Sequence, residues 1–130
     1  MYTIEKDFTI CCSHRLYDDK LSKIKNQQLY GKCNNMHGHN YDIKLVLEKE
    51  NLQNGMIINF NEIKEVFKIV IDDKFDHKCL NDCKEFNGYV PTAENMCKIF
   101  FYLLTPKLHD LSAIQIHETN GACATYRETE

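Results

Sequence analysis

The sequence of 130 residues lacks any surplus of positive charge and any long apolar run. Its 16 Lys and Arg residues are scattered among 19 Asp and Glu residues, so the formal net charge is −3. Nucleic acid or an anionic membrane surface would require a basic patch that this pattern does not provide. Residues 1–7 carry charges where a secretory signal would need an apolar run, and no later stretch reaches membrane-spanning length. The sequence therefore predicts a cytoplasmic protein with neither nucleic acid nor a membrane as its partner.

Glycine and proline are also scarce, with five and two residues respectively. No linker rich in these residues divides the chain, and no glycine-rich phosphate-binding loop is present. With 43% hydrophobic residues, the composition is that of a folded globular chain, and we expect residues 1–130 to form a single domain. The seven cysteines are an odd number in a chain that is large enough to form a core without cross-links, which predicts free thiols.

Hydrophobic periodicity predicts two strands, two helices and two further strands, in that order. Alternation of apolar and polar residues indicates strands at 8–14, 37–47, 111–119 and 123–127. Helical spacing follows two N-cap candidates, Asn59 and Thr92, and Asn120-Gly121 is a strong turn signal between the last two strands. The ββααββ order predicts an α+β fold in which two helices cover one face of an antiparallel four-stranded sheet. Residues 17–36 are polar and show no steady period, so we expect a long loop that borders the active site.

Three histidines point to a metal centre. His37 and His39 are two residues apart on a predicted strand, so their side chains share its apolar face, and His14 ends another strand on its core face. If these strands pair, three imidazoles converge. Three neutral imidazoles with an open fourth position are typical of catalytic zinc, although two strand histidines also occur without any metal.

Other residues have side chains suited to catalysis. A thiol near a cation loses its proton easily, so Cys33, four residues before His37, is a candidate general base or nucleophile; the alternative is a fourth, structural zinc ligand. Asp76 and His77 form a candidate proton shuttle, or an adjacent pair without function. Glu118 continues the apolar face of the strand at 111–119, where a carboxylate needs a partner. That partner is either a ligand with paired nitrogen donors or a buried cation.

The motifs together resemble the 6-pyruvoyltetrahydropterin synthase / 6-carboxytetrahydropterin synthase family. The resemblance spans nearly the whole chain in order and rests on five strings of residues: Cys12-Ser13-His14-Arg15-Leu16, the segment from Gly31-Lys32-Cys33 to His37-Gly38-His39-Asn40-Tyr41, Asp76-His77 with Leu80-Asn81-Asp82, Pro91-Thr92-Ala93-Glu94-Asn95, and His117-Glu118-Thr119. It implies the tunnelling fold, with four strands of each subunit joining a trimeric barrel and two trimers stacking into a hexamer. Active sites would then lie at subunit interfaces.

The resemblance also implies a role for each candidate residue. His14, His37 and His39 would bind Zn²⁺ and Cys33 would be the catalytic base. Asp76 and His77 would relay protons, and Glu118 would hold the amino-pyrimidine edge of the pterin. The substrate implied is 7,8-dihydroneopterin triphosphate.

Two products are compatible with these motifs. The spacing from Cys33 to His37 and the segment 91–95 resemble the carboxy enzymes, which form 6-carboxy-5,6,7,8-tetrahydropterin and release acetaldehyde and triphosphate in the queuosine (7-deazaguanine) pathway. Segments 29–35 and 39–41 also resemble the pyruvoyl enzymes, which eliminate triphosphate in the tetrahydrobiopterin pathway. The sequence favours the carboxy product. A hypothesis of another class is a non-catalytic ligand-binding or assembly protein, with Cys33 closing a structural zinc site.

Overall fold

The computed structural model describes residues 1–128, and its central feature is a long antiparallel strand pair. Strand β1 (Tyr2–His14) pairs with β2 (His37–Lys49) along its whole length, from Tyr2 opposite Lys49 to His14 opposite His37. Strand β4 (Leu111–Thr119) lies antiparallel on the other side of β2, and β5 (Ala122–Arg127) forms a hairpin with β4. A two-residue strand, β3 (Lys78–Cys79), pairs in parallel with the end of β1. The strand order is therefore β3-β1-β2-β4-β5.

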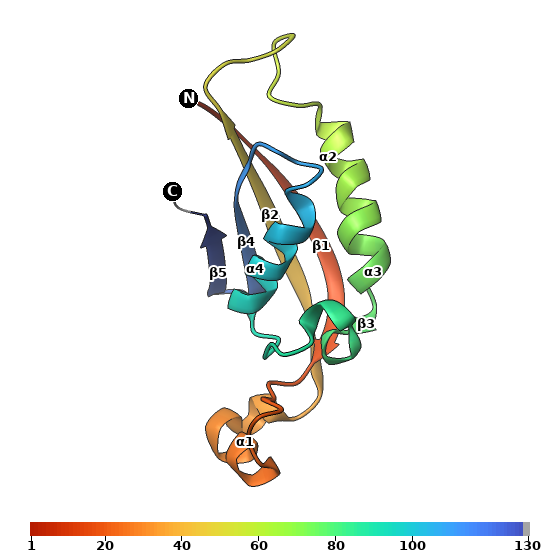
Figure 1. Ribbon diagram of the computed structural model, residues 1–130, viewed down its shortest axis with the longest axis vertical. Helices are drawn as coiled ribbons and strands as arrows, with labels where there is room; N and C mark the ends of the chain where they lie inside the picture. The colour runs from red at the N-terminus through yellow and green to blue at the C-terminus, as the bar shows by residue number, and fades with distance from the viewer. Residues whose placement is uncertain (129–130) are drawn as a thin grey trace.

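One face of this sheet is covered by helices (Figure 1). Helix α2 (Phe60–Phe67) continues through a π-helical turn (Lys68–Asp72) into α3 (Asp73–Phe75), and α4 (Ala93–Leu104) packs on β4 and β5. The predicted N-caps are confirmed, since the side chains of Asn59 and Thr92 accept hydrogen bonds from backbone N–H groups in the first turns of α2 and α4. None of the helices in the described residues has both the length and the apolarity needed to cross a membrane.

The core lies between the sheet and these helices. Along β2 the side chains of Tyr41, Ile43, Leu45 and Leu47 are buried, whereas the intervening residues are half-buried or exposed. The predicted alternation of this strand is thus confirmed. A stack between Phe8 and Phe67, with ring centroids 3.9 Å apart, attaches α2 to β1.

The polar segment between β1 and β2 differs from its prediction, because it contains a helix. Helix α1 (Lys23–Tyr30) and a 3₁₀ turn (Gly31–Asn34) lie beyond the ends of the long strands (Figure 1). Asn26 is fully buried there; its side chain accepts from the Asp18 N–H and donates to the carbonyls of Asp18, Leu21 and Ser22. Hydrogen bonds from a single amide therefore order a segment that has little apolar surface to bury.

The α+β tunnelling-fold prediction is confirmed, but the strand count was wrong. Strand β3 adds a fifth strand, and its parallel pairing with β1 makes the sheet mixed. The sequence did not reveal this strand because two residues are too few to show any alternation. Two further 3₁₀ turns (Leu80–Asp82 and Lys84–Phe86) connect β3 to α4. All seven cysteines are free thiols, as predicted.

Candidate metal centre and active site

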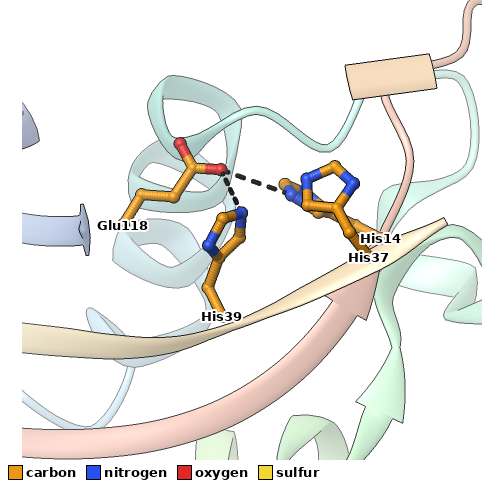
Figure 2. Close-up of side chains that lie close together, drawn as sticks. All are labelled: His14, His37, His39 and Glu118. Atoms are coloured by element: carbon orange, nitrogen blue, oxygen red, sulfur yellow. Dashed lines mark ion pairs between the residues drawn. The ribbon is translucent and has the colours of Figure 1, made fainter. Parts of the chain in front are cut away.

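Strand pairing brings the three predicted histidines together at one end of the sheet. His14 and His37 are directly opposite each other in the β1–β2 register, and His39 lies two residues further along the same face of β2. Each of these histidines, together with Glu118, offers a ligand atom within 4.8 Å of all the others (Figure 2). Gly38 separates the two β2 histidines where a Cβ would approach the Cys12 carbonyl oxygen to 3.3 Å. The predicted convergence of three imidazoles is therefore present in a single chain.

Backbone carbonyls fix the orientation of two of the rings. His14 Nδ1 lies 2.7 Å from the Pro91 carbonyl oxygen, and His37 Nδ1 lies 2.6 Å from that of Asn35. A carbonyl oxygen only accepts, so in both rings Nδ1 carries the proton and donates it. The lone pair of each ring is then on Nε2, which is the arrangement seen when an imidazole binds a metal through Nε2.

The cluster is rich in electron pairs and has little positive charge of its own. His14 is fully buried, and burial lowers its pKa, so this imidazole is neutral near pH 7. Glu118 Oε1 lies 3.0 Å from His39 Nε2 and 3.3 Å from His14 Nε2, shown as dashed lines in Figure 2. Even so, His39 Nε2 is buried without a hydrogen-bond partner among the described residues. A cation held by the three imidazoles would satisfy this nitrogen and offset the charge of the neighbouring carboxylate, and three imidazole ligands suit zinc with its fourth position left open.

The sequence predicted that Glu118 binds a ligand and did not predict its contact with the histidines. The structure places it on the core face of β4, as the alternation with Ile114 and Ile116 predicts. Because β4 pairs with β2, this face continues into the histidine face, and the carboxylate reaches His39. Its contact with the histidines was missed because the sequence did not show which strand neighbours β2.

Tyr41 is a residue of the site that the sequence analysis did not single out. It is fully buried on the same face of β2, and its hydroxyl lies 3.3 Å from both ring nitrogens of His14. Burial raises the pKa of Tyr41, so the hydroxyl keeps its proton. Its position two residues after His39 was the signal that could have identified it.

Cys33 does not belong to the cluster of four ligand side chains. It lies in the 3₁₀ turn before β2 with its side chain exposed. The Cys33 carbonyl accepts a hydrogen bond of 2.8 Å from the Leu16 N–H, which ties this turn to the chain just after His14. The backbone of Cys33 is therefore tied to the chain just after β1, while its thiol is open to solvent and is not enclosed among the three imidazoles.

Asp76 and His77 form a pair of their own beside β1. Asp76 accepts hydrogen bonds from the Cys11 N–H at 2.8 Å and from His77 Nδ1 at 2.9 Å, and the Cys11 bond contributes most to lowering the pKa of Asp76. The ionised carboxylate holds the His77 ring with Nε2 free. The His77 side chain is 79% exposed, and the residue has a positive φ of 62°. In one chain, therefore, this pair faces solvent and lies outside the histidine cluster.

Comparisons with known proteins agree with this geometry. The family model described as 6-pyruvoyl tetrahydropterin synthase matches residues 3–129. A Dictyostelium discoideum protein named 6-pyruvoyl tetrahydrobiopterin synthase is 44% identical over 120 residues, which cover 88% of this chain and 87% of that protein. An Archaeoglobus fulgidus protein provisionally named 6-carboxy-5,6,7,8-tetrahydropterin synthase is 31% identical over 96 residues, covering 74% and 79%.

Comparison of the fold with solved structures points to the same family. The structure of Caenorhabditis elegans 6-pyruvoyl tetrahydropterin synthase superposes with a TM-score of 0.91 at 32% identity, and the match covers 98% of this chain and 96% of that one. The family model matches residues 3–129, which include the strands that carry the histidine cluster, and the structural match covers 98% of the chain. The chain belongs to the 6-pyruvoyl tetrahydropterin synthase family.

Proposed function

We propose that this protein is a zinc-dependent lyase that eliminates triphosphate from 7,8-dihydroneopterin triphosphate and forms 6-pyruvoyl-tetrahydropterin. The observation that carries the proposal is the convergence of His14, His37, His39 and Glu118 in a chain of this family. The motifs alone favoured the carboxy product. The relatives support the pyruvoyl product instead, because the pyruvoyl-named Dictyostelium protein is more similar and covers more of the chain than the carboxy-named Archaeoglobus protein.

The three histidines would hold the metal through their ring nitrogens. Bound there, zinc would make the side-chain hydroxyls of the substrate more acidic. Glu118 lies next to His39 and is 29% exposed, so its carboxylate is accessible to a ligand that enters the cluster. In this proposal Glu118 accepts hydrogen bonds from the amino-pyrimidine nitrogens of the pterin while remaining beside the imidazoles.

Proton transfer is assigned to the exposed groups. Cys33 is proposed as the base that removes a proton from the substrate side chain, and a nearby zinc ion would favour its thiolate. Asp76 accepts the Nδ1 proton of His77, which leaves Nε2 of that ring free to take up and release a proton. Because Cys33 and His77 are both open to solvent in one chain, we propose that active sites are completed between subunits, in a hexamer built from two trimers.

The competing hypothesis is a non-catalytic protein with a closed zinc site. It requires Cys33 to be the fourth ligand of the three histidines. The side chain that accompanies them is Glu118, and Cys33 is exposed outside the cluster. This arrangement supports the enzyme.

Product analysis by mass spectrometry tests the proposal. The zinc-loaded protein is incubated with 7,8-dihydroneopterin triphosphate, with chelator-treated protein as the control. We expect 6-pyruvoyl-tetrahydropterin and inorganic triphosphate from the loaded protein alone. Release of acetaldehyde with a 6-carboxy product would instead assign the chain to the carboxy branch, and unchanged substrate would refute the enzyme.

A further inference from the structure

A polar cavity of about 610 Å³ lies beside the histidine cluster and has no part in the roles assigned above. Its walls come from the segment after β1, from helix α1, from the residues just before β2 and from the turns between β3 and α4. Two wall residues adjoin the proposed metal ligands. Arg15 directly follows His14, and Asn35 is the residue whose carbonyl oxygen accepts from His37 Nδ1. Through Asn35, one wall of the cavity contacts the His37 ring, so a group bound in the cavity would lie near the cluster.

Arg15 is half-buried in the cavity wall, and none of the described carboxylates lies within 4.0 Å of its guanidinium. The guanidinium carbon lies 4.1 Å from the centroid of the Tyr17 ring, so a cation–π contact holds the guanidinium over the face of that ring. A partly buried charge without a counterion is costly, and an oxyanion would relieve the cost.

The backbone of Arg15 is held from both sides by one amide. Asn81 accepts a hydrogen bond of 2.9 Å from the Arg15 N–H and donates one of 3.0 Å to the Arg15 carbonyl. In the same region Asn34 donates to the Leu16 carbonyl at 3.0 Å. These bonds fix the start of the Arg15 side chain before any ligand arrives, which reduces the entropy lost on binding.

We infer that this cavity binds the triphosphate chain of the substrate, with Arg15 as the principal contact and Lys23 as the second cation. The inference rests on the proposed function, since that function supplies a substrate with a triphosphate arm. A guanidinium donates two parallel hydrogen bonds to phosphate oxygens, and the neutral amides of Gln27, Asn35 and Asn87 line the same cavity. The carboxylates of Asp19 and Asp82 also line it, so the wall carries as many acidic as basic groups. Binding then depends on the fixed guanidinium and not on a general positive field.

Titration calorimetry with inorganic tripolyphosphate tests this site without requiring turnover. We expect Arg15→Gln in the full-length protein to weaken tripolyphosphate binding roughly 10- to 100-fold, because a charge-assisted bidentate contact is lost. Lys23→Gln, at an exposed position, should weaken it by a smaller factor, and Asp19→Asn should strengthen it by removing a like charge. Dihydroneopterin without phosphates serves as the matched ligand, and its affinity should be the same for wild type and Arg15→Gln.

The outcomes separate this inference from the proposed activity. If tripolyphosphate binds Arg15→Gln and Lys23→Gln as tightly as wild type, the cavity is not the phosphate site, whether or not the enzyme is active. Equal losses of affinity for tripolyphosphate and for dihydroneopterin would also overturn the inference, since they would indicate general damage. If tripolyphosphate binding depends on Arg15 while dihydroneopterin triphosphate is not turned over, the anion site stands and the proposed lyase activity fails.

Discussion

Replacement of His39 by Asn tests the metal centre with a change whose two effects can be calculated separately. His39 Nε2 is buried and has no hydrogen-bond partner among the described residues, so its loss removes no hydrogen bond from the metal-free protein. The ring does pack edge-on against His14 and Tyr41, with centroids 5.2 Å and 5.5 Å apart. We expect the metal-free variant to lose about 1 kcal/mol of unfolding free energy, a typical value for a single substitution, because it loses these ring contacts and the 3.0 Å approach of His39 Nε2 to Glu118.

The effect on zinc binding should be much larger. Free zinc at 100 times the dissociation constant stabilises a folded protein by about 2.7 kcal/mol, which for a chain of this length raises the melting temperature by roughly 10 °C. Loss of even an indirect partner of a metal ligand weakens binding 10- to 100-fold, so loss of an imidazole ligand should weaken it by at least ~100-fold. At the same zinc concentration the variant would then gain no more than about 0.4 kcal/mol.

Thermal melts of both proteins with and without zinc, together with the bound zinc content, measure the two effects. His109→Asn is the matched control, because His109 is exposed in the turn before β4 and lies outside the cluster. It should keep the full zinc-dependent shift. If His39→Asn also keeps the full shift and binds one equivalent of zinc, the three imidazoles do not form the metal site and the proposed mechanism is wrong.

Three further substitutions test separate parts of the structure. Cys33→Ala should retain stoichiometric zinc and change the unfolding free energy by less than about 0.5 kcal/mol, because the side chain is exposed, yet mass spectrometry should show no product; loss of zinc would favour the structural role instead. Asp76→Asn should be less stable than wild type near pH 7. Because the Cys11 N–H holds the pKa of Asp76 below its usual value, urea titrations should show this difference shrinking as the pH falls through that lowered pKa, and a difference independent of pH would contradict the assigned hydrogen bond. Phe100→Ala should cost about 3–5 kcal/mol in the same urea titrations, since this fully buried ring joins α4 to Phe75 and Phe86; a cost under about 1 kcal/mol would show that the site collapses around the cavity.

The parts of the fold that could be predicted are those where burial alternates with a clear period. Strand β2 is such an element, because each buried residue from Tyr41 to Leu47 is followed by a more exposed one. Strand β1 was predicted only from Phe8, whereas it begins at Tyr2. Its first residues are exposed or half-buried on both faces, so the apolar signal there is weak. Helix α1 has no apolar face at all, and it depends on the buried amide of Asn26, which no hydrophobic pattern can reveal.

The candidate site also has parts that could be predicted from the sequence and parts that could not. The histidines could be predicted because strand geometry places His37 and His39 on one face, and the alternation of residues 8–14 places His14 on the core face of another strand. The contact of Glu118 with this group depends on β4 lying next to β2, a long-range pairing that no local pattern encodes. Cys33 and the Asp76–His77 pair remain proposals, because in one chain they face solvent and no contact with the cluster tests their roles.

The carbonyl that anchors His14 belongs to Pro91, the residue just before the N-cap of α4. The Thr92 hydroxyl accepts from the Asn95 N–H, and the Asn95 amide donates to the Val90 carbonyl, so the first turn of the helix braces this carbonyl. Fraying of that turn would free the His14 ring to rotate, and Nε2 would then no longer point toward the other ligand atoms. Conversely, a metal ion bound to His14 would suppress fraying of a helix turn more than 75 residues away in sequence. Metal binding and the stability of the first turn of α4 are therefore thermodynamically coupled.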